Sequence, residues 1–193
     1  MVICPEELCT GCGVCAEVCP THYISLVEDS EGFRRPIIDA SKCIDCGLCR
    51  DHCPANHDFH FSKRLEQPQV YAAKACNKDV LKESSSGGVF SVLAKYVIER
   101  EGSVFGCALD DHLNPIHVEA TTEKEIAAMR GSKYVQSDTS DTFRKAKALL
   151  DNGKHVLYSG TPCQIAGLNS FLGKDHDSLL TIDLICHGVP SNL

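Results

Sequence analysis

The sequence predicts two domains of different class, a small α+β domain followed by an α/β domain with a mostly parallel sheet. One observation is that nine of the 13 cysteines fall before residue 54. A second is a twelve-residue repeat in that region, beginning at Cys9 and again at Cys43. A third is the alternation of strand and helix patterns from Val70 onward, which is typical of α/β domains. A polar connection separates the two parts, and we place the boundary near Glu66, giving domains 1–66 and 67–193.

The elements are expected in the following order. In the first domain, Tyr23–Val27 and Pro36–Ile38 form short strands around a turn at residues 30–32. In the second domain, apolar spacing and end signals predict strands at 69–76, 103–109, 115–121, 155–160 and 178–188, and helices at 84–102, 122–131, 139–153 and 161–173.

Composition narrows the possible partners. Apolar residues make up 43% of the 193 residues and charged residues 23%, which is typical of a globular protein. A net charge of −7 without a basic block argues against nucleic acid and anionic membranes. The apolar stretch 89–98 is interrupted by Lys95 and is too short for a transmembrane segment, and the N-terminus lacks the features of a signal peptide. We therefore expect a cytoplasmic protein.

The repeat carries the strongest chemical signal. "CTGCGVCAEVCP" returns 34 residues later as "CIDCGLCRDHCP" with six of twelve positions identical, and each copy reads C-x2-C-x2-C-x3-C-P. Three thiolates at this spacing wrap one face of a 4Fe-4S cubane, and the fourth reaches the other cluster. Gly13 and Gly47 permit the tight curl. The spacing predicts a ferredoxin-like domain with two 4Fe-4S clusters, the first held by Cys9, Cys12, Cys15 and Cys53 and the second by Cys43, Cys46, Cys49 and Cys19.

Zinc binding and disulfide bonding fit the cysteine pattern less well. Zinc sites use C-x2-C pairs but rarely two triplets each followed by C-P. An odd number of cysteines in a chain without a secretion signal argues against a disulfide scaffold. Cys4 precedes the first copy, and it is either an ordinary thiol near the cluster or a substitute ligand.

Three loops of the second domain could bind a cofactor. "SSSGG" at 84–88 opens a helix and either caps it or binds a phosphate at the free N–H groups. "GSKYVQSD" begins at Gly131, and its Lys133 could neutralise a phosphate while Tyr134 stacks on a ring. "YSGTPCQ" joins a strand to a helix, with Thr161 as N-cap and Pro162 at the first helical position.

Cys163 lies in the first turn of that last helix. Three roles remain open for it: a thiol nucleophile with His187 as its base, the lining of a cofactor pocket, or packing alone. The pairing with His187 is possible because "ICHG" follows another strand, and the carboxyl ends of parallel strands meet at one edge. Cys76 and Cys107 are expected to be buried small apolar residues.

Taken together, these motifs resemble a known family. The double cysteine module followed in order by "SSGGVFS", "GSKYVQS", "SGTPCQIAGL" and "DLICHGVPS" is similar to the coenzyme F420 hydrogenase/dehydrogenase beta-subunit family. The resemblance implies a flavin, expected to be FAD, that takes electrons from the clusters and exchanges hydride with a small organic acceptor or donor such as a deazaflavin. It also implies a redox partner protein or subunit.

The family motifs place a set of residues around the flavin. Their assignment to parts of the flavin rests on helix-end physics. The set is Ser85, Ser86, Gly87, Gly88, Gly131, Ser132, Lys133, Tyr134, Gly160, Thr161, Pro162, Cys163, Gln164, Cys186, His187 and Gly188, with Cys163 and His187 also as catalytic candidates.

The chain departs from the family at its end. Family members continue well beyond the "CHGVPS" motif, whereas this sequence stops at Leu193, five residues after Gly188. We therefore expect an incomplete flavin-associated domain. Three explanations remain open: a fragment, a truncated gene product or a split subunit. The expected function is an iron–sulfur flavoprotein oxidoreductase or its N-terminal part. The alternative is a non-catalytic ferredoxin-type carrier with an α/β docking domain.

Overall fold

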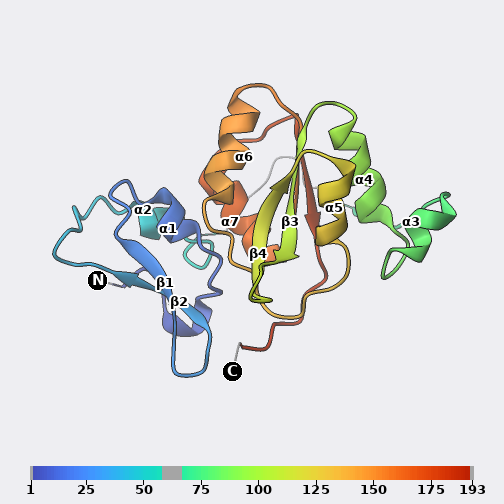
Figure 1. The fold of residues 1–193 in the computed structure, drawn as a ribbon. Coiled ribbons are helices and arrows are strands. Elements are labelled where there is room, and N and C mark those ends of the chain that lie inside the picture. The colour runs from blue at the N-terminus through green and yellow to red at the C-terminus, as the bar shows by residue number, and fades with distance from the viewer. Residues whose placement is uncertain (1, 58–66, 192–193) are drawn as a thin grey trace.

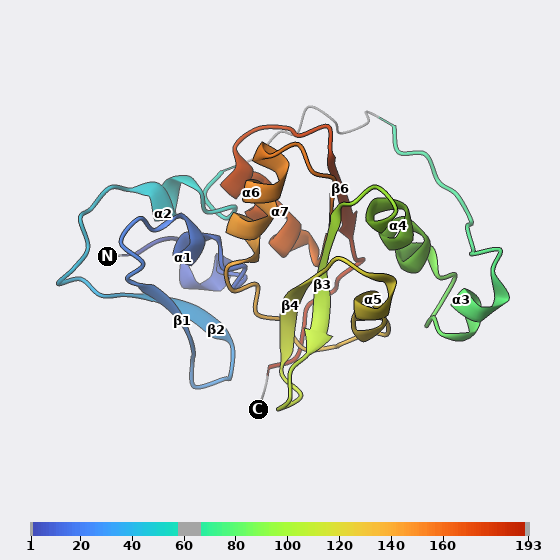
Figure 2. The ribbon, with the colours of Figure 1, turned by 45° about the horizontal axis from the view of Figure 1, so that its top comes forward.

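The computed structural model describes residues 2–57 and 67–191. The cysteine-rich region lies beside two helices of the second domain, α6 (Thr142–Asp151) and α7 (Pro162–Leu172), in both views of the ribbon (Figures 1 and 2). Helices α4 (Val89–Ile98) and α5 (Glu123–Met129) lie on the other side of the sheet (Figures 1 and 2). The expected boundary near Glu66 falls outside the described residues.

The cysteine-rich region has a short helix for each repeat and a hairpin between them. Both α-helices begin directly after a glycine with positive φ, +88° at Gly13 and +78° at Gly47, so the expected tight curl of each repeat is present. The hairpin strands are antiparallel, with Leu26 opposite Pro36. The elements are η1 (Glu6–Leu8), α1 (Val14–Val18), β1 (Ile24–Glu28), β2 (Arg34–Ile38) and α2 (Leu48–Asp51).

The second domain is built on a four-stranded sheet in the order β4-β3-β5-β6. Its strands are β3 (Ser103–Leu109), β4 (Pro115–Ala120), β5 (Val156–Gly160) and β6 (Leu179–Asp183). β3, β5 and β6 run parallel, while β4 forms an antiparallel pair with β3. The prediction of an α/β domain with a mostly parallel sheet is confirmed. The carboxyl ends of the parallel strands share one edge, which places the β5–α7 turn and residues 184–188 near each other.

Each face of the sheet has its own core. On the α6 and α7 side, Phe105, Phe143, Tyr158 and Leu168 are fully buried, and Cys12 of the first repeat belongs to the same cluster of contacts. On the α4 and α5 side, Ala94, Val104, Ile126 and Leu157 fill the second core. The cysteine-rich region is therefore packed onto the second domain through the first of these cores.

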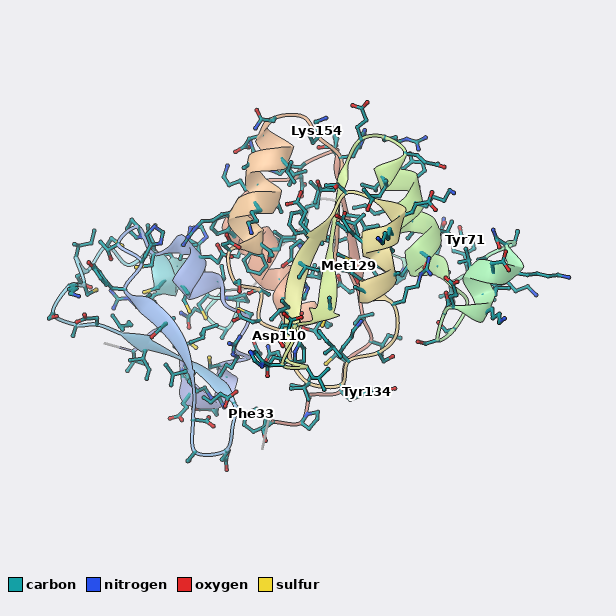
Figure 3. All side chains as sticks on the ribbon, in the orientation of Figure 1. Phe33, Tyr71, Asp110, Met129, Tyr134 and Lys154 are labelled. Carbon is teal, nitrogen blue, oxygen red and sulfur yellow. The ribbon has the colours of Figure 1, made fainter. Side chains whose placement is uncertain are left out.

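The strand expected at 69–76 is wrong. These residues form no ladder, and Val70 and Tyr71 are 93% and 76% exposed. Figure 3 places Tyr71 toward α3 (Lys78–Lys82), a short helix that the sequence pattern did not predict. After Tyr71 the stretch continues with alanines and a lysine, residues that are depleted in strands because they bury little surface on a pleated sheet.

Polar contacts also hold the two regions together. Arg34 forms an ion pair with Asp138 at 2.8 Å, and Gln136 donates to the carbonyl of Thr10. Elsewhere between the two regions, the Ser170 hydroxyl donates to the carbonyl of His52, directly before Cys53. These contacts fix the cysteine loops relative to the β5–α7 turn.

Within residues 2–57 and 67–191, no helix has the length and apolar character needed to cross a membrane.

Candidate iron–sulfur centre

The structure brings four predicted ligands of the first cluster to one cavity of about 150 Å³. Cys9, Cys12 and Cys15 come from the first repeat, and Cys53 comes from the end of the second repeat. Two further thiols line the same cavity, Cys4 and Cys163. We refer to it as the inner cavity because it faces the second domain. Its remaining walls are mostly apolar: Ile3, Leu8, Val14, Leu26, Pro36 and Ala55 contribute.

The loop of the first repeat is held by its backbone. Gly11 has a φ of +64° and approaches the carbonyl of Arg34 so closely that a Cβ would lie 2.8 Å from the oxygen. The guanidinium of Arg35 donates to the carbonyl of Cys9 and, at 3.4 Å, to that of Glu6. These restraints direct the thiols of the loop into the cavity.

Burial gives the inner cavity its electrostatic character. Cys12, Cys15 and Cys53 are 7–8% exposed. Burial, which disfavours the charged form, raises the pKa of Cys12 to about 12 and raises that of Cys15 further. Thiols in such surroundings stay protonated unless a positive centre stabilises their thiolates. A cationic iron core supplies that charge, so the donor set fits a cluster.

A second cavity collects the other predicted set. Cys43, Cys46 and Cys49 line it together with Cys19 from the first repeat, and its volume is about 20 Å³. Cys46 is exposed, and the neighbouring Ile44 is 63% exposed. We refer to it as the outer cavity. Each cavity thus contains three thiols of one repeat and one of the other.

Among the described residues, no three His, Cys, Asp or Glu side chains form a group that could hold one metal ion.

Cys163 lies at the inner cavity. Helix α7 has Thr161 as its N-cap and Pro162 in its first turn, as the sequence predicted, and Thr161 also forms a capping box with Gln164. The Cys163 sulfur lies 3.1 Å from the Thr161 hydroxyl. One turn later, a Cβ on Gly167 would lie 3.4 Å from the Cys12 sulfur. The start of α7 therefore forms part of the wall of the inner cavity.

The pairing of Cys163 with His187 gains no support from the geometry. In the described part of the chain, no hydrogen bond joins the two side chains. Cys186, His187 and Gly188 are all exposed, and the contacts of the Cys186 sulfur are with the backbone of Gly188. A thiol enzyme with His187 as base stays a prediction.

The loop at 84–88 leaves the start of α4 open. Gly88 is the N-cap with a φ of +72°, and no side chain caps the helix. Ser84 donates instead to the carbonyl of Val80, while Ser85 and Ser86 are exposed. Gly87 packs against backbone, since a Cβ there would lie 2.5 Å from the carbonyl oxygen of Ala73. Plain capping by a serine is therefore not what this loop does.

The 131–138 loop approaches the same helix. Arg130, directly before Gly131, donates to the Ser91 hydroxyl at 3.1 Å and forms an ion pair with Glu83. Lys133 does not extend into solvent, because its ammonium group donates to the carbonyls of Ala128 and Arg130 at the end of α5.

The remaining loop residues differ in exposure. Ser132 is exposed, and Tyr134 is 79% exposed and lies on the loop after α5 in Figure 3. Gly160 is buried, and a Cβ there would lie 3.0 Å from the side-chain oxygen of Gln164. Neither thiol cavity is lined by the predicted flavin residues other than Cys163.

A buried polar network surrounds His117, and the sequence motifs did not indicate it. The His117 Nε2 donates to the carbonyl of Ser159 at 2.9 Å, and its Nδ1 accepts from the Ser137 hydroxyl at 2.8 Å. Gln164, which is 1% exposed, donates to both the hydroxyl and the carbonyl of Ser137. Burial lowers the pKa of His117 to about 4, so the ring is neutral. Strand alternation in "PIHVEA" could have indicated that His117 faces the interior.

Comparisons with known proteins agree with the two-part organisation. Residues 8–57 match the family model of the 4Fe-4S dicluster domain. Residues 70–144 match the model described as coenzyme F420 hydrogenase/dehydrogenase, beta subunit N-term.

Among curated proteins, the chain is 27% identical over 192 residues to the coenzyme F420-dependent sulfite reductase of Methanocaldococcus jannaschii, covering 96% of this chain and 28% of that protein. It is 28% identical over 123 residues to the coenzyme F420 hydrogenase subunit beta of Methanococcus voltae, covering 60% of this chain and 44% of that protein. The chain thus spans less than half the length of either relative.

A solved structure of the F420-reducing [NiFe] hydrogenase complex from Methanosarcina barkeri aligns with a TM-score of 0.49 and 22% identity, over 67% of this chain and 50% of that one. The family resemblance seen in the motifs is confirmed by the two family models and the curated relatives. The chain thus matches a 4Fe-4S dicluster domain over residues 8–57, followed by the N-terminal domain of the coenzyme F420 hydrogenase/dehydrogenase beta subunit over residues 70–144.

Proposed function

We propose that this chain is the electron-relay part of an iron–sulfur flavoprotein oxidoreductase. The two matched domains indicate an iron–sulfur electron-transfer oxidoreductase subunit. The finer proposal is that the flavin is FAD and that it exchanges hydride with a deazaflavin of the coenzyme F420 type. The names of both curated relatives include that coenzyme, which supports the choice of acceptor.

The observation that carries the relay is the asymmetry of the two thiol cavities. The outer cavity has the exposed Cys46 at its rim, whereas the first turn of α7 forms part of the wall of the inner cavity. We assign Cys43, Cys46, Cys49 and Cys19 to the outer cluster and Cys9, Cys12, Cys15 and Cys53 to the inner one. When bound, the clusters would carry single electrons and the flavin would combine two electrons and a proton into a hydride.

We propose a direction of electron transfer through the chain, from the outer cavity to the inner one. A redox partner protein or subunit would approach the outer cavity, where Ile44 and Cys46 reach the surface. The inner cavity touches Cys163 and lies at the edge of the sheet where the β5–α7 turn begins. We therefore propose that the inner cysteines pass electrons into the second domain.

The flavin site is proposed at that edge and at the start of α4. The uncapped N–H groups beyond Gly88 offer donors and a positive helix end to a phosphate. The loops at Gly131–Tyr134, Gly160–Gln164 and Cys186–Gly188 complete the proposed set. We propose that the protein lies in the cytoplasm, because no disulfide joins any of the 13 cysteines and disulfides are rare in reducing compartments.

The test is anaerobic reconstitution with iron, sulfide and FAD, followed by removal of unbound flavin. Retained flavin absorbance and reduction of a deazaflavin by the loaded chain support the proposal. Ser86→Glu puts a negative charge on the proposed phosphate site and should weaken FAD binding about tenfold or more, equivalent to about 1.4 kcal/mol. Ser140→Glu, at another exposed serine, should leave FAD binding unchanged.

A second candidate is the non-catalytic carrier with an α/β docking domain. It is favoured by the finding that neither thiol cavity is lined by the flavin-loop residues apart from Cys163. A chain that binds iron, retains no flavin and still reduces a partner protein would establish this candidate and exclude the flavoprotein.

A further inference from the structure

The two thiol cavities differ in their number of cysteines. The outer cavity is lined by four, all of which belong to the repeats. The inner cavity is lined by six, because Cys4 and Cys163 join the four repeat cysteines. A cubane takes four thiolates. Two thiols at the inner cavity are therefore in excess of what the repeat pattern requires.

Cys4 lies beside two of the proposed ligands. It packs against the buried cluster that contains Cys53, and it lines the inner cavity together with Cys9 and Cys53. The sulfur of Cys4 is thus within reach of the positions that two cluster ligands occupy. Cys163, by contrast, has its hydrogen bond with Thr161 of its own helix start.

The segment that carries Cys4 is anchored. Ile3 is 8% exposed and packs with Cys15, Cys49 and Cys53. The side-chain amide of Asn56 donates to the carbonyl of Ile3 at 2.9 Å and to that of Arg50 at 3.0 Å. The same amide group therefore ties the Cys4 segment to the chain on both sides of Cys53.

We infer that Cys4 is a reserve ligand of the inner cluster that can replace Cys53. Cys9, Cys12 and Cys15 come from one continuous segment, the first repeat with the start of α1, whereas Cys53 reaches the cavity from the second repeat. Cys53 is therefore the ligand whose position depends on a separate segment. In the exchange, the iron–sulfur bond of Cys53 breaks and that of Cys4 forms. The proton of the Cys4 thiol passes to the Cys53 sulfur, and no electron is gained or lost.

The inference rests on the proposed ligand sets. Cysteine variants distinguish a failure of the reserve role from a failure of those ligand sets. Each variant is reconstituted anaerobically with ferrous iron and sulfide, and iron and sulfide are counted per chain. Wild type should hold about eight iron. Cys53→Ala should also hold about eight, whereas Cys53→Ala with Cys4→Ala should hold about four. Cys53→Ala with Cys163→Ala should still hold about eight, which distinguishes Cys4 from the other extra thiol.

The outer cavity provides the matched control. Cys19 is its cross-repeat ligand, and no extra cysteine lines that cavity. Cys19→Ala should therefore hold about four iron. If Cys53→Ala also falls to about four while wild type holds about eight, the reserve role is wrong and the proposed clusters stand. If wild type itself does not bind about eight, the proposed function fails at its first step.

A measurement without any ligand substitution covers the case in which Cys53→Ala does not fold. A chelator removes iron from the loaded protein. The measured quantity is the rate at which the more slowly released half of the iron, assigned to the inner cluster, is lost. Cys4→Ala should release this half several-fold faster than wild type, because no second thiol recaptures the iron. Cys76→Ala, at an exposed cysteine away from both cavities, should match wild type. Equal rates for Cys4→Ala and wild type would overturn the inference.

Discussion

Gly167 of α7 faces the sulfur of Cys12 across the interface between the two regions, and a Cβ at Gly167 would lie 3.4 Å from that sulfur. The ring of Phe143 lies equally close to the same position. A helix of the second domain thus packs directly on a cysteine of the first repeat, which makes the inner cavity a product of both domains.

This contact predicts the effect of a larger residue. Gly167→Val should destabilise the loaded chain by about 1–3 kcal/mol, because α7 cannot withdraw from Cys12 and Phe143 without opening the core. Anaerobic denaturant unfolding measures the loss, and the spectrum of the inner cluster should change while that of the outer cluster does not. Ala148→Val, at an exposed position of α6, is the control. Equal changes in the spectra of both clusters would contradict this picture of the interface.

The buried hydrogen bond of Glu17 across the interface predicts a loss of stability when its acceptor is removed. Its Oε1 accepts a hydrogen bond from the backbone N–H of Phe143 at 3.2 Å, and its side chain is 2% exposed. The Nε of Arg144 lies 3.4 Å from Oε2 but donates its hydrogen bond to the backbone carbonyl of Glu17. Glu17→Leu leaves the buried N–H without an acceptor and should cost about 1–3 kcal/mol in unfolding free energy. Glu17→Gln keeps an acceptor and should cost less. Equal losses for the two variants would show that the hydrogen bond is not responsible.

His117 predicts a pH dependence. Burial lowers the pKa of His117 from 6.5 to about 4, so the unfolded chain takes up a proton at a higher pH than the folded chain does. The contribution of neutral His117 to the free energy of unfolding is therefore fully present above pH 6.5 and is lost as the pH falls toward 4. The loss over that window is about 3 kcal/mol.

The comparison with His117→Gln isolates this contribution. A glutamine can donate and accept in the same network but does not titrate. The difference in unfolding free energy between wild type and His117→Gln should shrink as the pH falls from 6.5, measured at matched cluster loading. A difference that stays constant with pH would show that His117 is not the titrating group.

The exposure of the two cavities predicts two rates of iron loss. Cys46 of the outer cavity is exposed, while Cys12, Cys15 and Cys53 of the inner cavity are buried. A chelator should remove about half of the iron quickly and the rest slowly. Cys19→Ala, which removes the outer cluster, should eliminate the fast phase. A single rate for all iron would contradict the assignment of inner and outer sites.

The sequence was sufficient for features that depend on local spacing. The two sets of four cysteines follow from the repeat alone, because loop geometry and the glycines at 13 and 47 act within a few residues. The order of strands and helices from Ser103 onward was also predicted, since apolar periodicity and end residues such as Pro162 are local signals.

Features that depend on contacts between distant segments were not predictable. Three roles were open for Cys163, namely a thiol nucleophile with His187, the lining of a cofactor pocket, or packing alone. None of them foresaw that it lines the inner cavity together with cysteines more than a hundred residues earlier. The roles of Glu17 and His117 likewise depend on partners in other elements. The wrong strand at 69–76 shows the same limit, since a short apolar pattern does not reveal whether a sheet edge is available to it.

The iron and sulfide content of the anaerobically reconstituted chain tests the central claim most directly. Two cubanes, each bound by cysteines of both repeats, require about eight iron and about eight sulfide per chain. Cys12→Ala and Cys46→Ala should then report on different clusters, with the inner spectrum affected by the first and the outer by the second. Binding of about four iron, or of zinc without sulfide, by the wild-type chain would contradict the account.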